Sequence, residues 1–340
     1  MRTFFTFVFV LLLLGALAVG GGAWYALQQF GARGPAAMDG GEQTIVSLPM
    51  GTGLNQVANI LEQRGVVRSA LIFRAGVMYN QKAGALKAGE YAIPSGASPS
   101  DIMNILIEGK AIVYKLTLAE GLTSAMIINL VRQHPALTGD VGGEPAEGSL
   151  LPETYIFNRG MTRTELIQRM QKDHQDVVDQ LWAGRAPNLP ITTKEEAVIL
   201  ASIVEKETGI AEERPRVAAV FVNRLRKGMK LQSDPTIIYG LTKGVPLGRG
   251  IRQSELDRAT PYNTYVIPAL PPTPIANPGK ASIAAVLNPA PTDDLYFVAD
   301  GTGGHVFAST LQQHEQNVKN WREIERQRAT AAGSGSPTPR

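Results

Sequence analysis

The stretch TKEEAVILASIVEKETG, residues 193–209, joins a helix start, an apolar run and two carboxylates at a helix end. Thr193 and Glu196 have the three-residue spacing of a capping box, in which each residue satisfies a free backbone N–H group of the other. Most residues from 197 to 204 are apolar, so one side of the helix should pack against a core. The stretch therefore predicts a helix whose last turn carries acids just before Gly209.

The two acids of the last turn differ in direction. At about 100° per residue, the mean apolar direction lies roughly 55° from Glu207 and roughly 105° from Glu205. An acid that faces an apolar wall has a raised pKa and can act as a general acid near neutral pH. We therefore predict Glu207 as the catalytic acid and Glu205 as a supporting or alternative acid. The competing interpretation is that both are ordinary solvated charges.

The N-terminal segment is apolar. Residues 4–27 form an uncharged run of 24 residues, which is long enough for a helix to cross a bilayer. Arg2 precedes the run, and Trp24 and Tyr25 lie near its far end, as in a membrane helix with its N-terminus in the cytoplasm. The run predicts a single-pass anchor, with the acids outside the cytoplasm. A cleaved signal peptide is the alternative, for which the small residues 20–23 would provide the cleavage site.

The composition excludes several classes of function. The chain has 340 residues and no cysteine, so disulfides and thiolate metal sites are excluded. Its four histidines show no metal-binding spacing such as HExxH, and we expect no metal and no cofactor. The formal net charge of +3 is too weak to indicate a nucleic-acid surface. About 310 residues follow the apolar run, enough for two domains.

The region after the apolar run begins as a Gly, Ala and Pro-rich segment over 30–41, which is typical of a tether. Patterning then predicts a strand at 44–48, helices at 54–63 and 69–78, and a strand at 88–94. This β-α-α-β order resembles the LysM glycan-binding module. A small spacer domain without a ligand is the alternative.

The rest of the chain predicts a second, larger domain. Residues 98–109 read as a connecting helix and 112–118 as a strand, and helices mix with short strands up to about residue 322. The predicted fold class is α+β. The predicted segments are a cytoplasmic N-terminus (1–3), a transmembrane helix (4–27), a linker (28–43), a LysM-like domain with its connecting helix (44–110), a catalytic domain (111–325) and a disordered tail (326–340).

Several later segments carry neutral polar and aromatic side chains, which suit a sugar because it offers both hydroxyl groups and apolar faces. Such residues also cap turns or satisfy buried backbone groups, and this alternative stays open for each. Glu153 and Glu120 are further pocket candidates, and His305 is a candidate hydrogen-bond partner. The substrate-binding residues predicted on these grounds are Asn223, Gln232, Ser233, Tyr262 and Asn263, together with Glu153.

Asp234 has two interpretations. It precedes Pro235 and an apolar helix start at Ile237, so it could be the N-cap of that helix. It could also be a second catalytic carboxylate. We favour the capping role.

Five segments in one order resemble the YceG-like (MltG) family of endolytic lytic transglycosylases. They are VEKET at 204–208, VFVNRL at 220–225, LQSDPT at 231–236, YNTY at 262–265 and GGHVF at 303–307. With the apolar run and the LysM-like unit, the resemblance covers nearly the whole chain. It implies an α+β enzyme of bacterial cell-wall glycan.

The resemblance implies a single-pass inner-membrane protein with its catalytic domain in the periplasm. Glu207 would protonate the oxygen between MurNAc and GlcNAc within nascent peptidoglycan strands and then deprotonate the MurNAc 6-hydroxyl group, which leaves a 1,6-anhydro end and terminates elongation. Thr208 matches the hydroxyl residue that follows the catalytic glutamate in such enzymes, so the resemblance adds it to the predicted substrate-binding residues. Peptidoglycan synthases (penicillin-binding proteins) are the implied partners. A peptidoglycan hydrolase using Glu207 with Asp234, and a non-catalytic glycan-binding scaffold, remain as alternatives.

Overall fold

The computed structural model describes residues 2–333 and divides the chain into two compact units. The first unit comprises the chain up to Lys115 together with residues 135–138 and 156–161. The second comprises 116–134, 139–155 and the chain from Thr162 onward. Residues 2–333 contain mostly helices and three two-stranded sheets. The predicted α+β class is thus confirmed, with helices in the majority.

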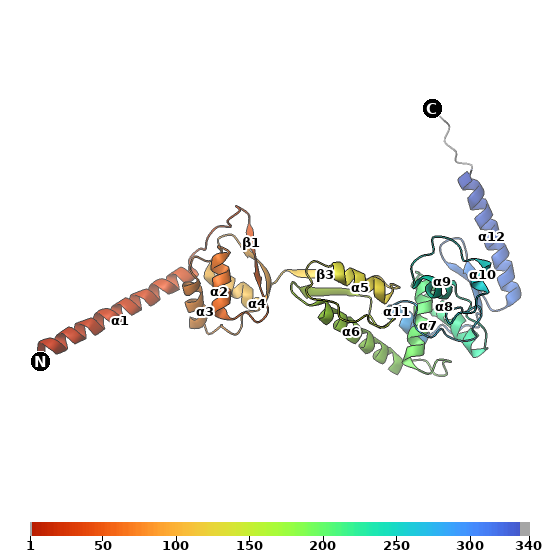
Figure 1. Cartoon of the computed structure of the whole chain (residues 1–340), viewed down its shortest axis with the longest axis horizontal. Helices are drawn as coiled ribbons and strands as arrows, with labels where there is room; N and C mark the ends of the chain where they lie inside the picture. The colour runs from red at the N-terminus through yellow and green to blue at the C-terminus, as the bar shows by residue number, and fades with distance from the viewer. Residues whose placement is uncertain (1, 334–340) are drawn as a thin grey trace, which may run out of the picture. The chain divides into compact units, whose positions relative to one another are not determined.

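The first unit has the predicted β-α-α-β order followed by a helix (Figure 1). Strands β1 and β2 pair antiparallel, with Val46 opposite Tyr91, and both side chains are fully buried. Ser69 caps α3 as predicted, because its hydroxyl accepts a hydrogen bond from the Ile72 N–H. Its elements are α1 (Arg2–Gly31), β1 (Gln43–Leu48), α2 (Leu54–Gln63), α3 (Ala70–Tyr79), β2 (Gly89–Pro94) and α4 (Pro99–Glu108).

The linker predicted over 28–43 is not a free tether. Helix α1 continues to Gly31, and Phe30 is 5% exposed in the core of the first unit. Its ring packs 6.5 Å from the ring of Phe73 and lies over Gly76, where a Cβ atom would come within 2.1 Å of it. The Gly, Ala and Pro-rich composition suggested flexibility, but the apolar surface of Phe30 fixes the end of α1 to α3.

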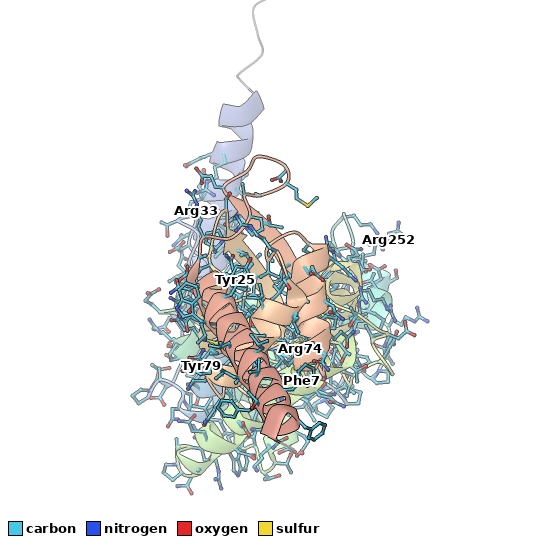
Figure 2. The ribbon with its side chains drawn as sticks, turned by 90° about the vertical axis from the view of Figure 1, so that its left-hand side faces the viewer. Phe7, Tyr25, Arg33, Arg74, Tyr79 and Arg252 are labelled. Carbon is cyan, nitrogen blue, oxygen red and sulfur yellow. The ribbon has the colours of Figure 1, made fainter. Side chains whose placement is uncertain are left out.

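Helix α1 covers the predicted transmembrane segment. Phe7 projects outward from it (Figure 2), and many of its large apolar side chains are exposed, among them Phe4, Phe9, Leu12, Leu17 and Trp24. Among the residues that the structure describes, no helix is found that is both long enough and apolar enough to cross a membrane. The helix is therefore present, and its passage through a membrane stays a prediction.

The second unit holds the acidic helix. Strands β3 and β4 pair with each other, as do β5 and β6, and the boundary between the units runs through β3 and β4. The remaining elements are β3 (Val113–Thr117), α5 (Ser124–Gln133), β4 (Thr154–Asn158), α6 (Arg163–Ala183), α7 (Lys194–Glu207), α8 (Arg214–Arg226), α9 (Asp234–Thr242), α10 (Gln253–Leu256), α11 (Lys280–Leu287), β5 (Tyr296–Ala299), β6 (His305–Ala308) and α12 (Leu311–Gly333).

Helix α7 lies at the centre of the second core. The predicted capping box is confirmed, because the Thr193 hydroxyl accepts from the Glu196 N–H and the Glu196 carboxylate accepts from the Thr193 N–H. Every residue from 197 to 204 is buried, and α8, α9 and α11 pack around the helix (Figure 1). Even Ser202 is enclosed, with its hydroxyl bonded to the Ile199 carbonyl. Only the two ends of α7 can therefore present polar groups.

The C-terminal helix is longer than predicted. A disordered tail was predicted over 326–340, but α12 continues to Gly333. The prediction is therefore wrong for 326–333, and 334–340 lie outside the described residues. The core-forming residues that the tail lacks are supplied earlier in α12, which packs on β5 and β6 and extends past them as a helix.

Candidate active site

Glu207 is the last residue of α7 and lines a cavity of about 470 Å³. The walls come from α7, α8, α9, β5, α12 and two loops, so the site is assembled from segments far apart in the sequence. They combine acids, a buried arginine and aromatic rings. The lining residues are Glu207, Phe221, Arg224, Leu231, Gln232, Asp234, Tyr265, Phe297, Val298, His314 and Val318.

The carboxyl group of Glu207 is held in an environment that favours its protonated form. Burial raises its pKa from the ordinary 4.5 to about 7. The Ser233 hydroxyl donates a hydrogen bond of 2.5 Å to Oε1, which lowers the pKa, whereas the negative charge of Asp234 raises it. The electrostatic influence of His305 and Arg224, like the Ser233 hydrogen bond, lowers the pKa. Burial prevails, so Glu207 can both donate and accept a proton near neutral pH.

Gln232 and Ser233 both lie next to Glu207 or its cavity, in different roles. Gln232 lines the cavity and adopts a left-handed backbone conformation with φ of 52°, which is uncommon for a residue other than glycine. Ser233 is 1% exposed, and its hydroxyl is bonded to Glu207. Ser233 therefore supports the acid rather than presenting a free hydroxyl group to a sugar.

The predicted capping role of Asp234 is wrong. Helix α9 begins at Asp234, and Ser233 occupies the N-cap position. The Asp234 carboxylate instead lines the cavity with Glu207 and accepts a hydrogen bond of 2.7 Å from the Tyr265 hydroxyl. The Asp-Pro pair suggested a cap because Pro is common at the first helical position, but here it stands at the second.

Three polar residues of the cavity wall, Arg224, Tyr265 and His314, were not predicted. Arg224 is 7% exposed and donates to the carbonyl groups of Leu231 and Leu295, each at 2.7 Å. Tyr265 holds Asp234. Arg224 and Tyr265 stand inside the motifs VFVNRL and YNTY, in which the sequence predicts the neighbouring Asn and Tyr residues as ligands. His314, on α12, carries no comparable sequence signal.

Three predicted substrate-binding residues are engaged in the scaffold instead. Asn223 donates its amide to the carbonyl groups of Thr292 and Asp294. Asn263 is 1% exposed and donates to carbonyl groups within 255–258. Tyr262 is not among the residues that line the cavity. The alternative of satisfied backbone groups therefore describes the two asparagines.

Glu205 is a buried support. Its side chain is 4% exposed and lies 3.3 Å from Arg214, and its second oxygen accepts from the Gly279 N–H at 2.9 Å. Arg214 also pairs with Glu120 at 3.1 Å. Glu153 is exposed and, like Glu120, is absent from the cavity wall. None of these three acids is placed to act on a ligand in this cavity.

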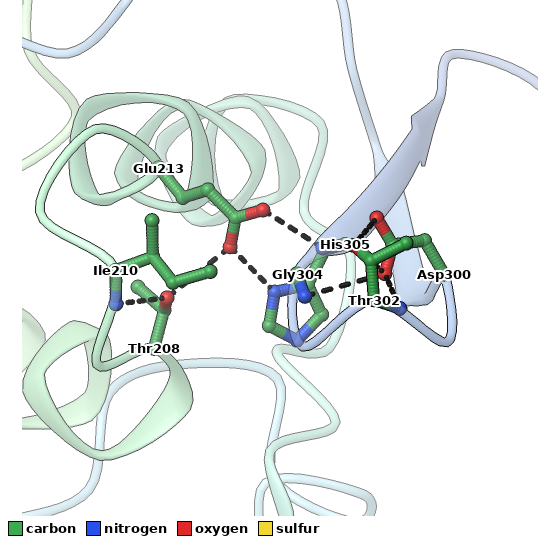
Figure 3. Close-up of polar contacts among 7 residues, drawn as sticks. All are labelled: Thr208, Ile210, Glu213, Asp300, Thr302, Gly304 and His305. Carbon is green, nitrogen blue, oxygen red and sulfur yellow. Dashed lines mark hydrogen bonds and ion pairs between the residues drawn. The ribbon is translucent and has the colours of Figure 1, made fainter.

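Thr208 and His305 meet at an acid that the sequence did not indicate. Thr208 is 4% exposed, and its hydroxyl donates to Glu213 at 3.2 Å. His305 Nδ1 lies 2.7 Å from the same carboxylate (Figure 3). The structure thus gives no free hydroxyl to Thr208 for the predicted contact with substrate. Within residues 2–333, no group of three His, Asp or Glu side chains is arranged to hold a metal ion.

Comparison with known proteins agrees with the motifs. The profile of the YceG-like family matches residues 46–320. The chain belongs to the YceG-like family. This confirms the resemblance drawn from the five sequence segments.

Two relatives extend over most of the chain. A Bacillus subtilis (strain 168) protein named endolytic murein transglycosylase is 31% identical, with 83% of this chain and 86% of that protein covered. A Streptococcus pneumoniae serotype 2 (strain D39 / NCTC 7466) protein of the same name is 29% identical over 80% of this chain, which spans 57% of that relative's length. A crystal structure of a yceG-like protein from Listeria monocytogenes is 28% identical, with a TM-score of 0.49, and covers 81% of this chain and 98% of that one.

The raised pKa of Glu207 predicts a pH-dependent cost in stability. Because the folded protein binds this proton up to about pH 7 and the unfolded chain only to about 4.5, the contribution of Glu207 is most favourable below pH 4.5 and is lost as the pH rises through 7. Between pH 4.5 and 8, Glu207→Gln should gain up to about 3 kcal/mol of unfolding free energy relative to the wild type. Urea unfolding of both proteins across this range measures the difference. Parallel stability curves would contradict the raised pKa.

Proposed function

We propose that the protein is an endolytic lytic transglycosylase of peptidoglycan, a lyase that cuts the MurNAc–GlcNAc β-1,4 bond within a glycan strand. The observation that carries the proposal is the carboxyl group of Glu207, which lines a cavity of about 470 Å³ with a pKa of about 7. The name shared by the Bacillus and Streptococcus relatives supports it. The remaining wall suits a sugar, because the rings of Phe221, Tyr265 and Phe297 offer apolar faces.

One carboxyl group is sufficient for this reaction. Protonated Glu207 gives its proton to the glycosidic oxygen as the bond from MurNAc C1 to that oxygen breaks, and the GlcNAc hydroxyl leaves. The resulting carboxylate takes the proton of the MurNAc C6 hydroxyl, whose oxygen bonds to C1 and closes the 1,6-anhydro ring. No water is consumed, and Glu207 ends protonated, ready for another cycle. A pKa near 7 suits a group that must act first as acid and then as base.

The groups around Glu207 serve the intermediate carboxylate. The Ser233 hydroxyl donates to Oε1, which fixes the direction of the carboxyl group. Arg224 and His305 favour the ionised form electrostatically. Gln232, at the cavity wall, is our candidate for holding an N-acetyl group.

A hydrolase is the second candidate, because Asp234 lines the same cavity as Glu207. Two carboxyl groups flanking a glycosidic bond are the usual arrangement of glycoside hydrolases, in which the second acts as nucleophile or base. Such an enzyme would consume water and leave reducing ends. We favour the lyase because Asp234 is held by Tyr265 and because the relatives are named transglycosylases.

Glu207→Gln should abolish the reaction while keeping the size of the side chain. The amide cannot transfer the proton, so release of anhydro-muropeptides from purified peptidoglycan should fall by on the order of 10² or more. Glu153→Gln is the matched control, because that acid is exposed and outside the cavity wall. Near wild-type release by the Glu207 variant would sink the assignment, and no release by the wild type would favour a glycan-binding scaffold.

Asp234→Asn separates the lyase from the hydrolase. In a lyase the variant should keep cleavage within about tenfold and still form anhydro ends. The negative charge of Asp234 raises the pKa of Glu207, so its removal should also move the alkaline limb of the pH–rate profile to lower pH. Mass spectrometry of the products is the measurement. Reducing ends from the wild type, with a loss above about a hundredfold in the variant, would establish the hydrolase instead.

We further propose that the protein is anchored in the inner membrane with its catalytic unit in the periplasm, where it terminates glycan elongation beside peptidoglycan synthases. The anchor rests on the uncharged run of residues 4–27, on Arg2 before it, and on the exposed apolar side chains of α1. A synthase partner is what the family suggests, because a terminating enzyme has to reach strands as they are made.

The membrane proposal predicts that the intact protein sediments with membranes and resists extraction by alkaline carbonate. A helix embedded in lipid is held by its apolar surface, so raising the pH should not release it. Immunoblots of membrane and soluble fractions give the measurement. Recovery of a soluble periplasmic form that begins near residue 22 would show a cleaved signal peptide and overturn the anchor.

A further inference from the structure

Glu213 collects three hydrogen bonds, one from Thr208 five residues earlier and two from the distant His305 (Figure 3). Its Oε1 accepts from the His305 backbone N–H at 2.7 Å. Its Oε2 lies 2.7 Å from His305 Nδ1 and accepts from the Thr208 hydroxyl at 3.2 Å. Burial alone would raise the pKa of Glu213, but the hydrogen bonds from His305 and Thr208 outweigh it and lower the pKa. Glu213 is therefore an ionised carboxylate that joins the start of α8 to the β5–β6 hairpin.

The Thr208 contact brings this carboxylate to the catalytic helix. Thr208 follows Glu207 directly and is the C-cap of α7. Its hydroxyl also accepts from the Ile210 N–H at 3.0 Å, which shapes the turn that leaves the helix. The Thr208 hydroxyl is thus bonded both to Glu213 and to the Ile210 N–H. Through these two bonds Glu213 fixes the turn directly after Glu207, and with it the direction of the backbone that carries Glu207.

The His305 ring lies beside the wall of the cavity that Glu207 lines. The ring packs edge-on against Phe297 at 5.2 Å, and Phe297 lines the cavity with Glu207. His305 is near enough to Glu207 for a positive charge on its ring to favour the Glu207 carboxylate. The side chains of His305 and Glu213 are 18% and 17% exposed. In so enclosed a place, a positive charge on the ring would need a negative partner, and Glu213 lies within hydrogen-bond distance to supply one.

The glycine before His305 leaves room for the pair. A Cβ atom at Gly304 would lie 2.8 Å from Glu213 Oε1, too close for the carboxylate to keep its place. The Gly304 N–H donates instead to Asp300 at 3.2 Å. The second glycine of the GGHVF segment is thus explained by the position of Glu213.

We propose that Glu213 and His305 are a positioning pair for the reaction, in which Glu213 fixes the direction of Glu207 through Thr208 and holds the His305 ring against Phe297 at the wall of the cavity that Glu207 lines. The inference rests on the proposed function. Neither residue touches the bond that breaks, and both act through Glu207.

Other groups around Glu207 act in both directions. Asp234 from α9 opposes the carboxylate, and Arg224 from α8 favours it. Tyr265 and His314 line the same cavity. The Arg224 guanidinium is already bonded to backbone carbonyl groups. Loss of His305 would therefore leave Arg224 alone against Asp234.

The test compares His305→Gln and Glu213→Gln with Thr302→Val, a control that removes hydrogen bonds from the same hairpin without changing charge. Two readouts are taken on the full chain. One is the titration of the Glu207 carboxyl group by carbon-13 NMR without substrate. The other is the pH profile of kcat/KM for anhydro-muropeptide release.

We expect both charge variants to titrate Glu207 at higher pH and to move the alkaline limb upward by about one pH unit, while Thr302→Val matches the wild type. An unchanged titration and limb in a folded His305→Gln protein would overturn the pair. The same holds if Thr302→Val gives equal shifts. If Glu213→Gln does not fold, His305→Gln decides alone. A wild type without anhydro product would refute the proposed function, and the NMR titration would still decide the inference.

Discussion

Helix α7 is enclosed by protein over eight consecutive residues, 197–204, and the rest of the site depends on that enclosure. A buried helix can offer polar chemistry only at its ends, where carbonyl groups and charges also need partners. Each side chain of the last turn has one. Glu205 is paired with Arg214 and the Gly279 N–H, and Lys206 donates to the Gly121 carbonyl. Glu207 receives only a neutral hydroxyl group, from Ser233, and is therefore the acid that remains reactive.

The elements that sequence could predict are those fixed by local chemistry. The capping box at Thr193, the cap at Ser69 and the helix that ends at Glu207 depend on residues within one or two turns, and all three are present. Ser233 and Asp234 exchange roles relative to the prediction, because a shift of one residue in a helix start is decided by distant contacts. Tyr265 supplies such a contact to Asp234.

Contacts between segments far apart in the chain explain most of what sequence missed. Glu213 and His305 are 92 residues apart in the sequence, and neither their residue types nor their spacing predicts that they pair. Arg224 stands in a marked motif, but its placement in the cavity wall follows from carbonyl groups of the 231 and 295 segments. Asn223 and Asn263, in the motifs VFVNRL and YNTY, were predicted as sugar ligands. Their side-chain amides instead donate hydrogen bonds to backbone carbonyl groups of loops. A polar residue in a motif can be kept for the shape of a site as much as for its chemistry.

The packing of Phe30 has a mechanical consequence. The Phe30 ring fills the space above Gly76 and lies buried beside Phe73. The end of α1 is therefore packed against the globular part of the first unit and not joined to it by a flexible hinge. If α1 tilts or rotates about its own axis, the globular part of the first unit should move with it as one body. Whatever surface holds α1 thus also sets the direction in which the first unit points, and a side chain larger than hydrogen at position 76 would loosen that coupling.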